Sequence, residues 1–252
     1  MKKFLTLHKI PLLIFLSCCA FYLAFAYDLE RIDFFKLLTL WGGLFVLSYK
    51  FFQLQRYNLK ILLAAAIIFR LLFLFAIPNL SQDFYRFIWD GRLLLEGINP
   101  YLMTPAENFS AGDLPFSGAQ ELFEGMGSLS AGNPTNYPPL NQLFFALAAL
   151  FGGNSILTSV VWLRIFIIAA DIGTFYFGRK LLKNLKLPES NIFLYLLNPL
   201  TIIELTGNLH FEGVMLFFLL AALYLLQCQK WLFSALFFSC SIAVKLIPLM
   251  FL

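Results

Sequence analysis

The sequence has little charge and few cysteines, and these shortages exclude whole classes of protein. Charged residues make up 13% of its 252 residues and hydrophobic residues 60%, whereas soluble domains contain roughly 45–50% apolar residues. This balance excludes a water-soluble domain and indicates an integral membrane protein. The four cysteines lie in or beside apolar runs, which argues against a disulfide framework. No glycine-rich phosphate loop opens a nucleotide-binding domain, and we expect neither a cofactor nor a nucleic-acid partner.

The apolar runs predict the fold class. They show no period-2 alternation, and an open sheet would leave backbone groups unpaired in lipid, so we expect helices. The runs cover residues 10–27, 34–52, 61–77, 140–151, 156–177, 192–205, 214–226 and 231–252. We expect an all-α, polytopic membrane protein with about seven to eight hydrophobic helices. Residues 1–252 are interpreted as one membrane domain, and a truncation at the C-terminus is left open because the chain ends within an apolar run.

Lysine and arginine residues set the expected orientation, because cytoplasmic loops carry an excess of them. Lys2, Lys3 and Lys9 place the N-terminus in the cytoplasm, and three cations at residues 50–60 place the second loop there. Residues 80–139 then form an extracytoplasmic loop. This loop contains seven acids, two arginines and no lysine, which agrees with that side. The expected location is a bacterial inner membrane with the active site facing outwards.

A second group of cations conflicts with a simple count of crossings. Four cations at residues 179–186 are expected in the cytoplasm, yet two full crossings by residues 140–151 and 156–177 would place them outside. The run at 140–151 is short, so we expect it to be re-entrant or to cross only partly. His210 and Asp83 then face the same side.

The segment after the third run combines acids, arginines and aromatic residues. No helix breaker lies between Asp83 and Asp90, which predicts a helix with these acids about 10 Å apart on one face and Arg86 between them. Its other face is aromatic, as in helices that lie in the membrane interface. Gly91 is expected to end this helix. Residues 104–135 are rich in Gly, Ser, Ala and Pro, and we expect them to be mobile.

Several motifs follow one another between residues 80 and 249. They are QDFYRFIWDGRLLLEGINPY after a span, NYPPL where the chain re-enters the membrane, NPLTIIELTGNLHFEG between later spans, and KLIPL near the end. In this order they resemble the polyprenyl-phosphate-dependent mannosyltransferases of the GT-C glycosyltransferase superfamily. The resemblance implies transfer of a sugar, with mannose expected, from a polyprenyl-phosphate donor. The acceptor would be a hydroxyl of a glycan or lipid at the outer face of the membrane.

The resemblance also implies roles for residues. In that superfamily an Asp at the start of the first large outer loop is the general base, which places the role on Asp83. The alternative for Asp83 is a solvated acid at a helix start, where the helix dipole favours it. A carboxylate can take the proton of the acceptor hydroxyl, and Arg86 and Arg92 are the nearest cations for the departing lipid phosphate. Direct displacement would invert the anomeric centre. Family members often have a second acid beside this Asp, but here the neighbour is Gln82, so we expect no metal site.

Other candidate residues keep two interpretations each. Asp90 either binds the acceptor or forms a salt bridge to Arg86. Arg86 and Arg92 either bind phosphate or extend to lipid headgroups. Tyr101 and Tyr137 are either sugar platforms or interfacial anchors.

A second polar cluster follows the run at 192–205. Glu204 lies near the end of this run, and Asn208, His210 and Glu212 come shortly after it. They either bind substrate on the side of Asp83 or are polar helix-end residues that face water. Lys245, within an apolar run, could reach a lipid phosphate or simply extend to the interface.

Two other functions remain open from the sequence. A transporter or flippase is the alternative, because charged residues within the apolar runs would suit a polar pathway between helices. The absence of an obvious inverted repeat disfavours it. A non-catalytic membrane scaffold is the third possibility. Arg164 and Asp171, seven residues apart on one helix face, are expected to be structural partners of other helices.

Overall fold

The computed structural model describes residues 9–110 and 114–251 as helices joined by turns. No strand occurs within these two ranges, and the expected all-α class is confirmed for them. Lys2 and Lys3, which contributed to the expected orientation, lie outside the described residues.

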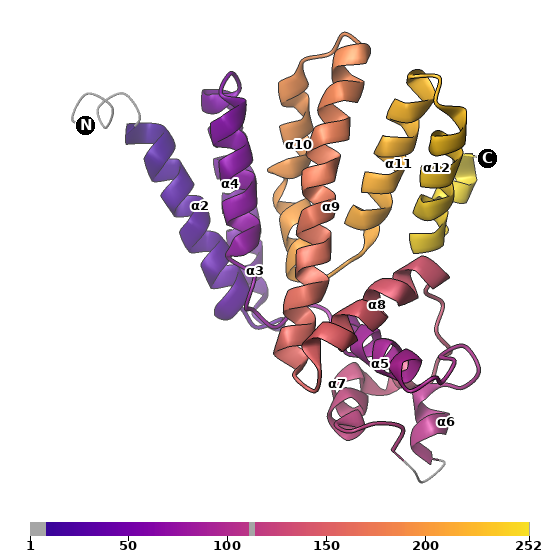
Figure 1. Ribbon diagram of the computed structural model, residues 1–252. Helices are drawn as coiled ribbons and strands as arrows, with labels where there is room; N and C mark the ends of the chain where they lie inside the picture. Colours follow the sequence, from indigo (N-terminus) through magenta and orange to yellow (C-terminus); the bar gives the residue numbers. More distant parts are fainter. Residues whose placement is uncertain (1–8, 111–113, 252) are drawn as a thin grey trace.

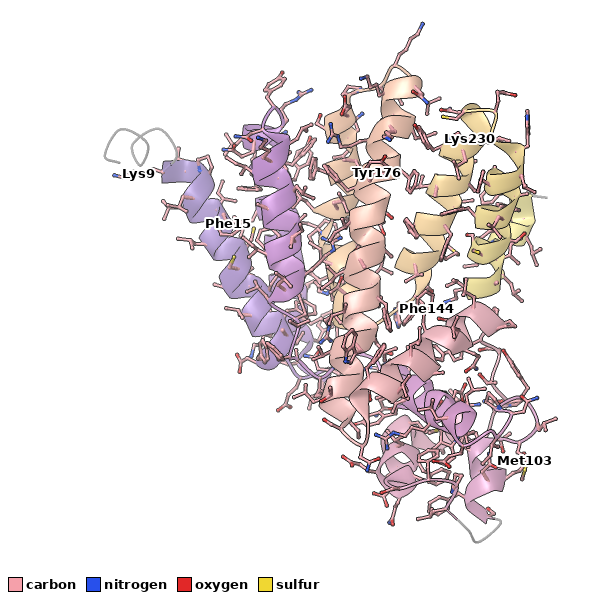
Figure 2. All side chains as sticks on the ribbon, viewed as in Figure 1. Lys9, Phe15, Met103, Phe144, Tyr176 and Lys230 are labelled. Carbon is pink, nitrogen blue, oxygen red and sulfur yellow. The ribbon has the colours of Figure 1, made fainter. Side chains whose placement is uncertain are left out.

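Six helices, called the long helices below, run roughly alongside one another (Figure 1). They are α2 (Lys9–Tyr27), α3 (Phe34–Gln55), α4 (Leu59–Leu71), α9 (Ile156–Asn184), α11 (Glu212–Gln227) and α12 (Trp231–Val244). Short polar side chains cap several of them: Asp33 accepts a hydrogen bond from the Lys36 amide, and Asn58 accepts one from the Ile61 amide. Side chains project from all of these helices (Figure 2), and many of them are large, apolar and exposed, as expected of surfaces that face lipid.

By length and composition, three helices in the described ranges can cross a membrane. They are α2, α3 and α9, and a fourth candidate span is a broken helix. The run at 192–205 is divided into η1 (Glu189–Ile192), α10 (Phe193–Leu196) and the π-helix η2 (Thr201–Gly207). A bend of 110° separates η2 from α11. The helices α4, α8 and α12 have 13, 14 and 14 residues, which is short for a complete crossing.

Four helices form a layer at one end of the long helices (Figure 1). They are α5 (Asp83–Leu95), α6 (Pro105–Ser110), α7 (Ala119–Ala131) and α8 (Pro139–Gly152). The helix α8 lies in this layer rather than beside the long helices, as its short apolar run suggested. Accordingly α9 begins at this layer and carries the cations of residues 179–186 to the opposite end, where α2 begins.

The sequence-based description of α5 needs two corrections. Gly91 does not end the helix, which continues to Leu95; its missing side chain instead allows α8 to approach, since a Cβ at Gly91 would lie 2.3 Å from the carbonyl oxygen of Phe145. The aromatic face, which was expected to lie in a membrane interface, is instead covered by protein. Phe84, Phe87 and Trp89 are at most 2% exposed, because α7 and α8 cover them.

The segment expected to be mobile contains α6 and α7. Ala119, Leu122 and Met126 of α7 are buried in the same core as the aromatic face of α5. Gly127, at a φ of 73°, kinks α7 where the chain turns back towards α5. Apolar residues spaced three and four apart therefore outweighed the turn-rich composition of residues 104–135.

Candidate active site

Asp83 stands at the first position of α5, where the helix dipole favours an acid. Its side chain is 51% exposed, and its Oδ2 atom lies 3.8 Å from Nε2 of His210. The charge distribution predicted that these residues face the same side, and the structure brings them together. Their separation is longer than a hydrogen bond, so the Asp83 carboxylate remains accessible.

His210 lies between two carboxylates. Its Nδ1 atom is 3.5 Å from Oε2 of Glu204, on the side of the ring opposite Asp83. The Asn208 amide donates a hydrogen bond of 3.1 Å to the same Glu204 oxygen. The sequence placed Glu204 in one polar cluster with Asn208 and His210, and the structure brings these three side chains together.

The backbone that presents Asn208 and His210 is irregular. The π-helix η2 ends at Gly207, and the buried Leu209 has a φ of 63°. Left-handed conformations of bulky residues are costly and persist where surrounding contacts enforce them. Here the turn lets the chain change direction between η2 and α11, which aims His210 towards Asp83.

Glu212 and Lys245 extend the same polar region. Glu212 begins α11, Lys245 follows α12, and their side chains form an ion pair in which each is about one-third exposed. The Glu212 charge also contributes to raising the pKa of Tyr137. Candidate residues from three distant parts of the sequence therefore meet at this end of the long helices.

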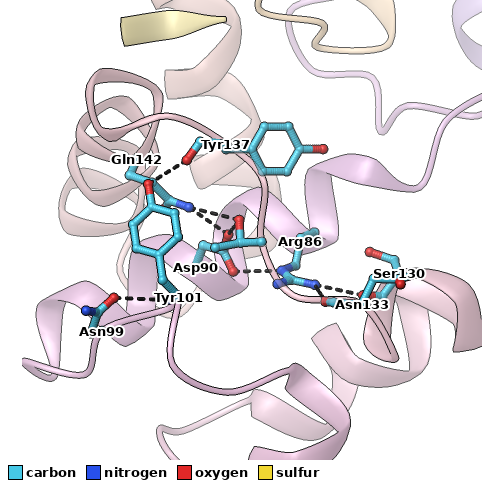
Figure 3. A network of polar contacts seen from close by, with 9 residues as sticks. Arg86, Asp90, Asn99, Tyr101, Ser130, Asn133, Tyr137 and Gln142 are labelled. Carbon is cyan, nitrogen blue, oxygen red and sulfur yellow. Dashed lines mark hydrogen bonds and ion pairs between the residues drawn. The ribbon is translucent and has the colours of Figure 1, made fainter. Parts of the chain in front are cut away.

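Asp90 is enclosed, unlike Asp83 (Figure 3). Its side chain is fully buried, and its Oδ1 atom accepts a 2.7 Å hydrogen bond from Nε of Arg86. The Oδ2 atom accepts bonds of 2.6 Å from the Thr135 hydroxyl and 2.9 Å from the Gln142 amide. Burial raises the pKa of Asp90, whereas these partners lower it. The salt bridge to Arg86, one of the two interpretations for Asp90, is formed.

Both arginines proposed for phosphate bind backbone carbonyls. Arg86 is 4% exposed, and its Nη1 atom donates to the carbonyls of Ser130 and Asn133 at 2.7 and 2.9 Å (Figure 3). Arg92 is 6% exposed and donates to the carbonyl of Ser117 at 3.2 Å. In this arrangement the arginines hold the chain around α7 against α5.

Tyr101 and Tyr137 join two loops beside this network. The Tyr101 hydroxyl donates a 2.6 Å hydrogen bond to the Tyr137 carbonyl. The Tyr137 ring packs edge-on against Phe87, with 5.0 Å between the ring centroids. Burial, reinforced by the Asp83 carboxylate, raises the pKa of Tyr137 well above its usual range, so its hydroxyl keeps its proton at neutral pH.

Three buried charged residues of the long helices, Arg70, Arg164 and Asp171, form structural contacts, as expected for Arg164 and Asp171. Asp171 pairs with Arg70 at 2.7 Å, and both side chains are 2% exposed. Arg164 donates only to carbonyl oxygens. None of these groups lines an open polar pathway in the described part of the chain, which weakens the transporter alternative. The same ranges contain no group of three or more metal-binding side chains with suitable geometry.

Comparison with known families identifies the class of protein. A family profile described as "Alpha-(1->6)-mannopyranosyltransferase, N-terminal domain" matches residues 21–252. The chain belongs to this family. The match confirms the mannosyltransferase resemblance that was based on motifs.

Two relatives carry the same description. The chain is 27% identical over 154 residues to alpha-(1->6)-mannopyranosyltransferase B of Corynebacterium glutamicum, covering 59% of this chain and 24% of that protein. It is 23% identical over 173 residues to alpha-(1->6)-mannopyranosyltransferase A of Mycobacterium tuberculosis, covering 68% of this chain and 32% of that protein. The chain thus matches about a quarter to a third of the length of these relatives. No solved structure matches it significantly.

Proposed function

We propose that this protein transfers mannose from a polyprenyl-phosphate donor to a hydroxyl of a glycan or lipid acceptor, forming an α-(1→6) linkage. The observation that supports this most strongly is the accessible Asp83 carboxylate, which faces His210 at one end of the long helices in a chain of the mannosyltransferase family. The linkage is taken from the names of the relatives.

The reaction needs a base and a way to stabilise the leaving group. Asp83 takes the proton of the acceptor hydroxyl while the oxygen of that hydroxyl forms a bond to the anomeric carbon of the donor sugar. The bond between that carbon and the phosphate oxygen breaks, and the lipid phosphate leaves with the electron pair. Such a displacement inverts the configuration at the anomeric carbon, so an α-linked product requires a β-linked donor.

Lys245 is the first candidate for contact with the donor phosphate. Its side chain is 36% exposed and lies at the Asp83 end of the molecule, paired with Glu212. Arg92 is the second candidate, because its Nε and Nη2 atoms, although buried, have no hydrogen-bond partner among the described residues. Arg86 is buried and donates to Asp90 and two carbonyls, so its contribution is to shape the site.

The outer face of the membrane is the proposed side of catalysis, and α4 and α12 are proposed to cross it together with the longer helices. The support is the positive-inside rule, because the cations at 179–186 lie at the end opposite Asp83. Cysteines placed singly at Asn184 and at Leu129 of α7, both exposed, in a cysteine-free background, can be probed with an impermeant thiol reagent. Labelling from outside is expected at position 129 alone; labelling at 184 instead would reverse the orientation.

The activity itself is tested with purified protein in detergent, where no transmembrane gradient exists and transport cannot register. Radiolabelled polyprenyl-phosphate mannose and a mannoside acceptor are expected to yield a disaccharide. Nuclear magnetic resonance of the product should show an α-(1→6) linkage. Movement of the labelled lipid across vesicles without any transfer would instead support the flippase alternative.

A further inference from the structure

Arg164 is a fully buried cation in the first third of α9, and its hydrogen bonds go to backbone carbonyls. Its Nε atom donates to Thr206 at 2.8 Å, its Nη2 atom to Gly207 at 3.0 Å and its Nη1 atom to Leu74 at 2.9 Å. No carboxylate of the described residues forms an ion pair with it. Burying an arginine is costly unless its donors are satisfied, so these contacts must offset that cost.

The three carbonyls belong to the two segments that carry the candidate site. Thr206 and Gly207 end the π-helix η2, just before Asn208 and His210. Leu74 lies in the turn after α4, within the connection that leads to Asp83. One guanidinium group therefore binds both the chain segment that leads to Asp83 and the segment that leads to His210, and these two residues lie 3.8 Å apart.

The geometry suits arginine and no other side chain. A guanidinium group presents five N–H donors in a rigid plane, whereas a lysine ammonium is a compact point on a flexible stem. Three carbonyls from two segments can thus be held at fixed mutual positions. The buried Leu209, with its φ of 63°, lies directly after the held carbonyls, where a strained turn needs such enforcement.

We propose that Arg164 is a positioning residue that sets the separation of Asp83 and His210. This inference rests on the proposed function, because it assigns Arg164 an effect on transfer through the two site residues.

Arg70 is a matched control for Arg164. It is also buried in a long helix and donates to two carbonyls, those of Ala66 and Leu196, but its charge is paired with Asp171. None of these partners lies on the segments that present Asp83 or His210. Replacing either arginine by lysine therefore perturbs a similar buried group. Only Arg164→Lys removes contacts to the segments that present Asp83 and His210.

The first experiment measures kcat, donor KM and thermal unfolding for Arg164→Lys and Arg70→Lys. We expect both to lower the unfolding temperature. Displacement of reacting groups by about 1 Å can cost on the order of 10²-fold, so Arg164→Lys should lower kcat at least about tenfold with donor KM nearly unchanged. Arg70→Lys should keep kcat within about twofold, since distant substitutions leave the geometry intact. Equal losses of kcat in both variants would overturn the proposal.

The second experiment asks whether the effect passes through His210. In a His210→Ala background, Arg164→Lys should lower kcat much less than in the wild type, because residues that act together are non-additive. A full and independent loss would refute the positioning role. Arg164→Gln, which keeps an amide donor, serves if the lysine variant does not fold. Failure of both to fold while Arg70→Lys folds would assign Arg164 to stability alone.

A third measurement does not depend on transfer activity. A protein with cysteines at positions 83 and 210 is treated with a short bifunctional thiol reagent. Arg164→Lys should lower the rate of cross-linking, and Arg70→Lys should leave it unchanged. Altered cross-linking without any mannosyl transfer would reject the proposed function but retain the positioning role, whereas unchanged cross-linking would reject the positioning role itself.

Discussion

Asp83 and Asp90 are two acids on one helix with opposite environments. Asp83 is half exposed and its carboxylate has no hydrogen-bond partner among the described residues, whereas Asp90 is fully buried and accepts hydrogen bonds from three side chains. The difference comes from what covers the helix: the end of α7 and the start of α8 enclose Asp90, while Asp83 precedes that cover. A carboxylate with its acceptors satisfied is a structural anchor, and one that faces open space can take a proton.

The largest effect on stability is expected at Asp90. Asp90→Ala would leave Arg86 as a buried, unpaired charge, which typically costs about 3–5 kcal/mol. Asp83→Ala, at an exposed position, should change the free energy of unfolding by no more than about 0.5 kcal/mol. Unfolding of both variants in the same detergent measures the difference. Equal destabilisation would remove the contrast between the two acids.

Gly91 allows the approach of α8 that encloses Asp90. Gly91→Ala would place a methyl group 2.3 Å from the Phe145 carbonyl oxygen, and overpacking of this kind costs about 1–3 kcal/mol. Gly42→Ala in α3 is the matched control, because nothing lies within 4 Å of its added methyl group. At position 42 the higher helix propensity of alanine should stabilise the folded protein slightly. A neutral Gly91→Ala would show that this helix contact is looser than described.

A smaller effect is expected at Tyr101. Tyr101→Phe removes the hydrogen bond to the Tyr137 carbonyl, and such a loss typically costs about 0.5–1.5 kcal/mol. Tyr57→Phe, at a residue that is 90% exposed, should leave the unfolding temperature unchanged. If Tyr101→Phe is equally silent, the two loops are not coupled through this bond.

No effect is expected from chelators. A divalent cation held by oxygen ligands usually needs clustered carboxylates, and the neighbour of Asp83 in the sequence is Gln82. Turnover in EDTA should equal turnover without it. A loss of activity that manganese restores would contradict this prediction.

Several features of the site could be predicted because they follow from charge and hydropathy. The cations at 179–186 and the short run at 140–151 together indicated that Asp83 and His210 share one side, and the structure places them 3.8 Å apart. The sequence grouped Glu204 with His210, but the backbone that joins them, a π-helix followed by a left-handed Leu209, could not be predicted. Neither has a signature in local composition.

In the layer formed by α5 to α8, some features could likewise be predicted from the sequence and others could not. The helical character of residues 83–90 follows from the lack of breakers, but the role of Gly91 depends on the later α8. Likewise, Arg86 looked like a phosphate ligand, and only the three-dimensional structure shows its carbonyl partners. Contacts between segments distant in sequence decide which charged groups are accessible.

The most direct test of this account is the turnover of Asp83→Asn, measured with donor binding and thermal unfolding on the same preparation. A general base contributes about 10²–10⁴-fold to rate, so turnover should fall by at least that lower factor. Donor affinity and unfolding temperature should stay near those of the wild type, because the amide is nearly isosteric and the side chain is half exposed. Glu96→Gln, at an exposed acid just after the same helix, should keep full turnover. An Asp83→Asn protein that retains more than about a tenth of wild-type turnover would contradict the role of Asp83 as the base.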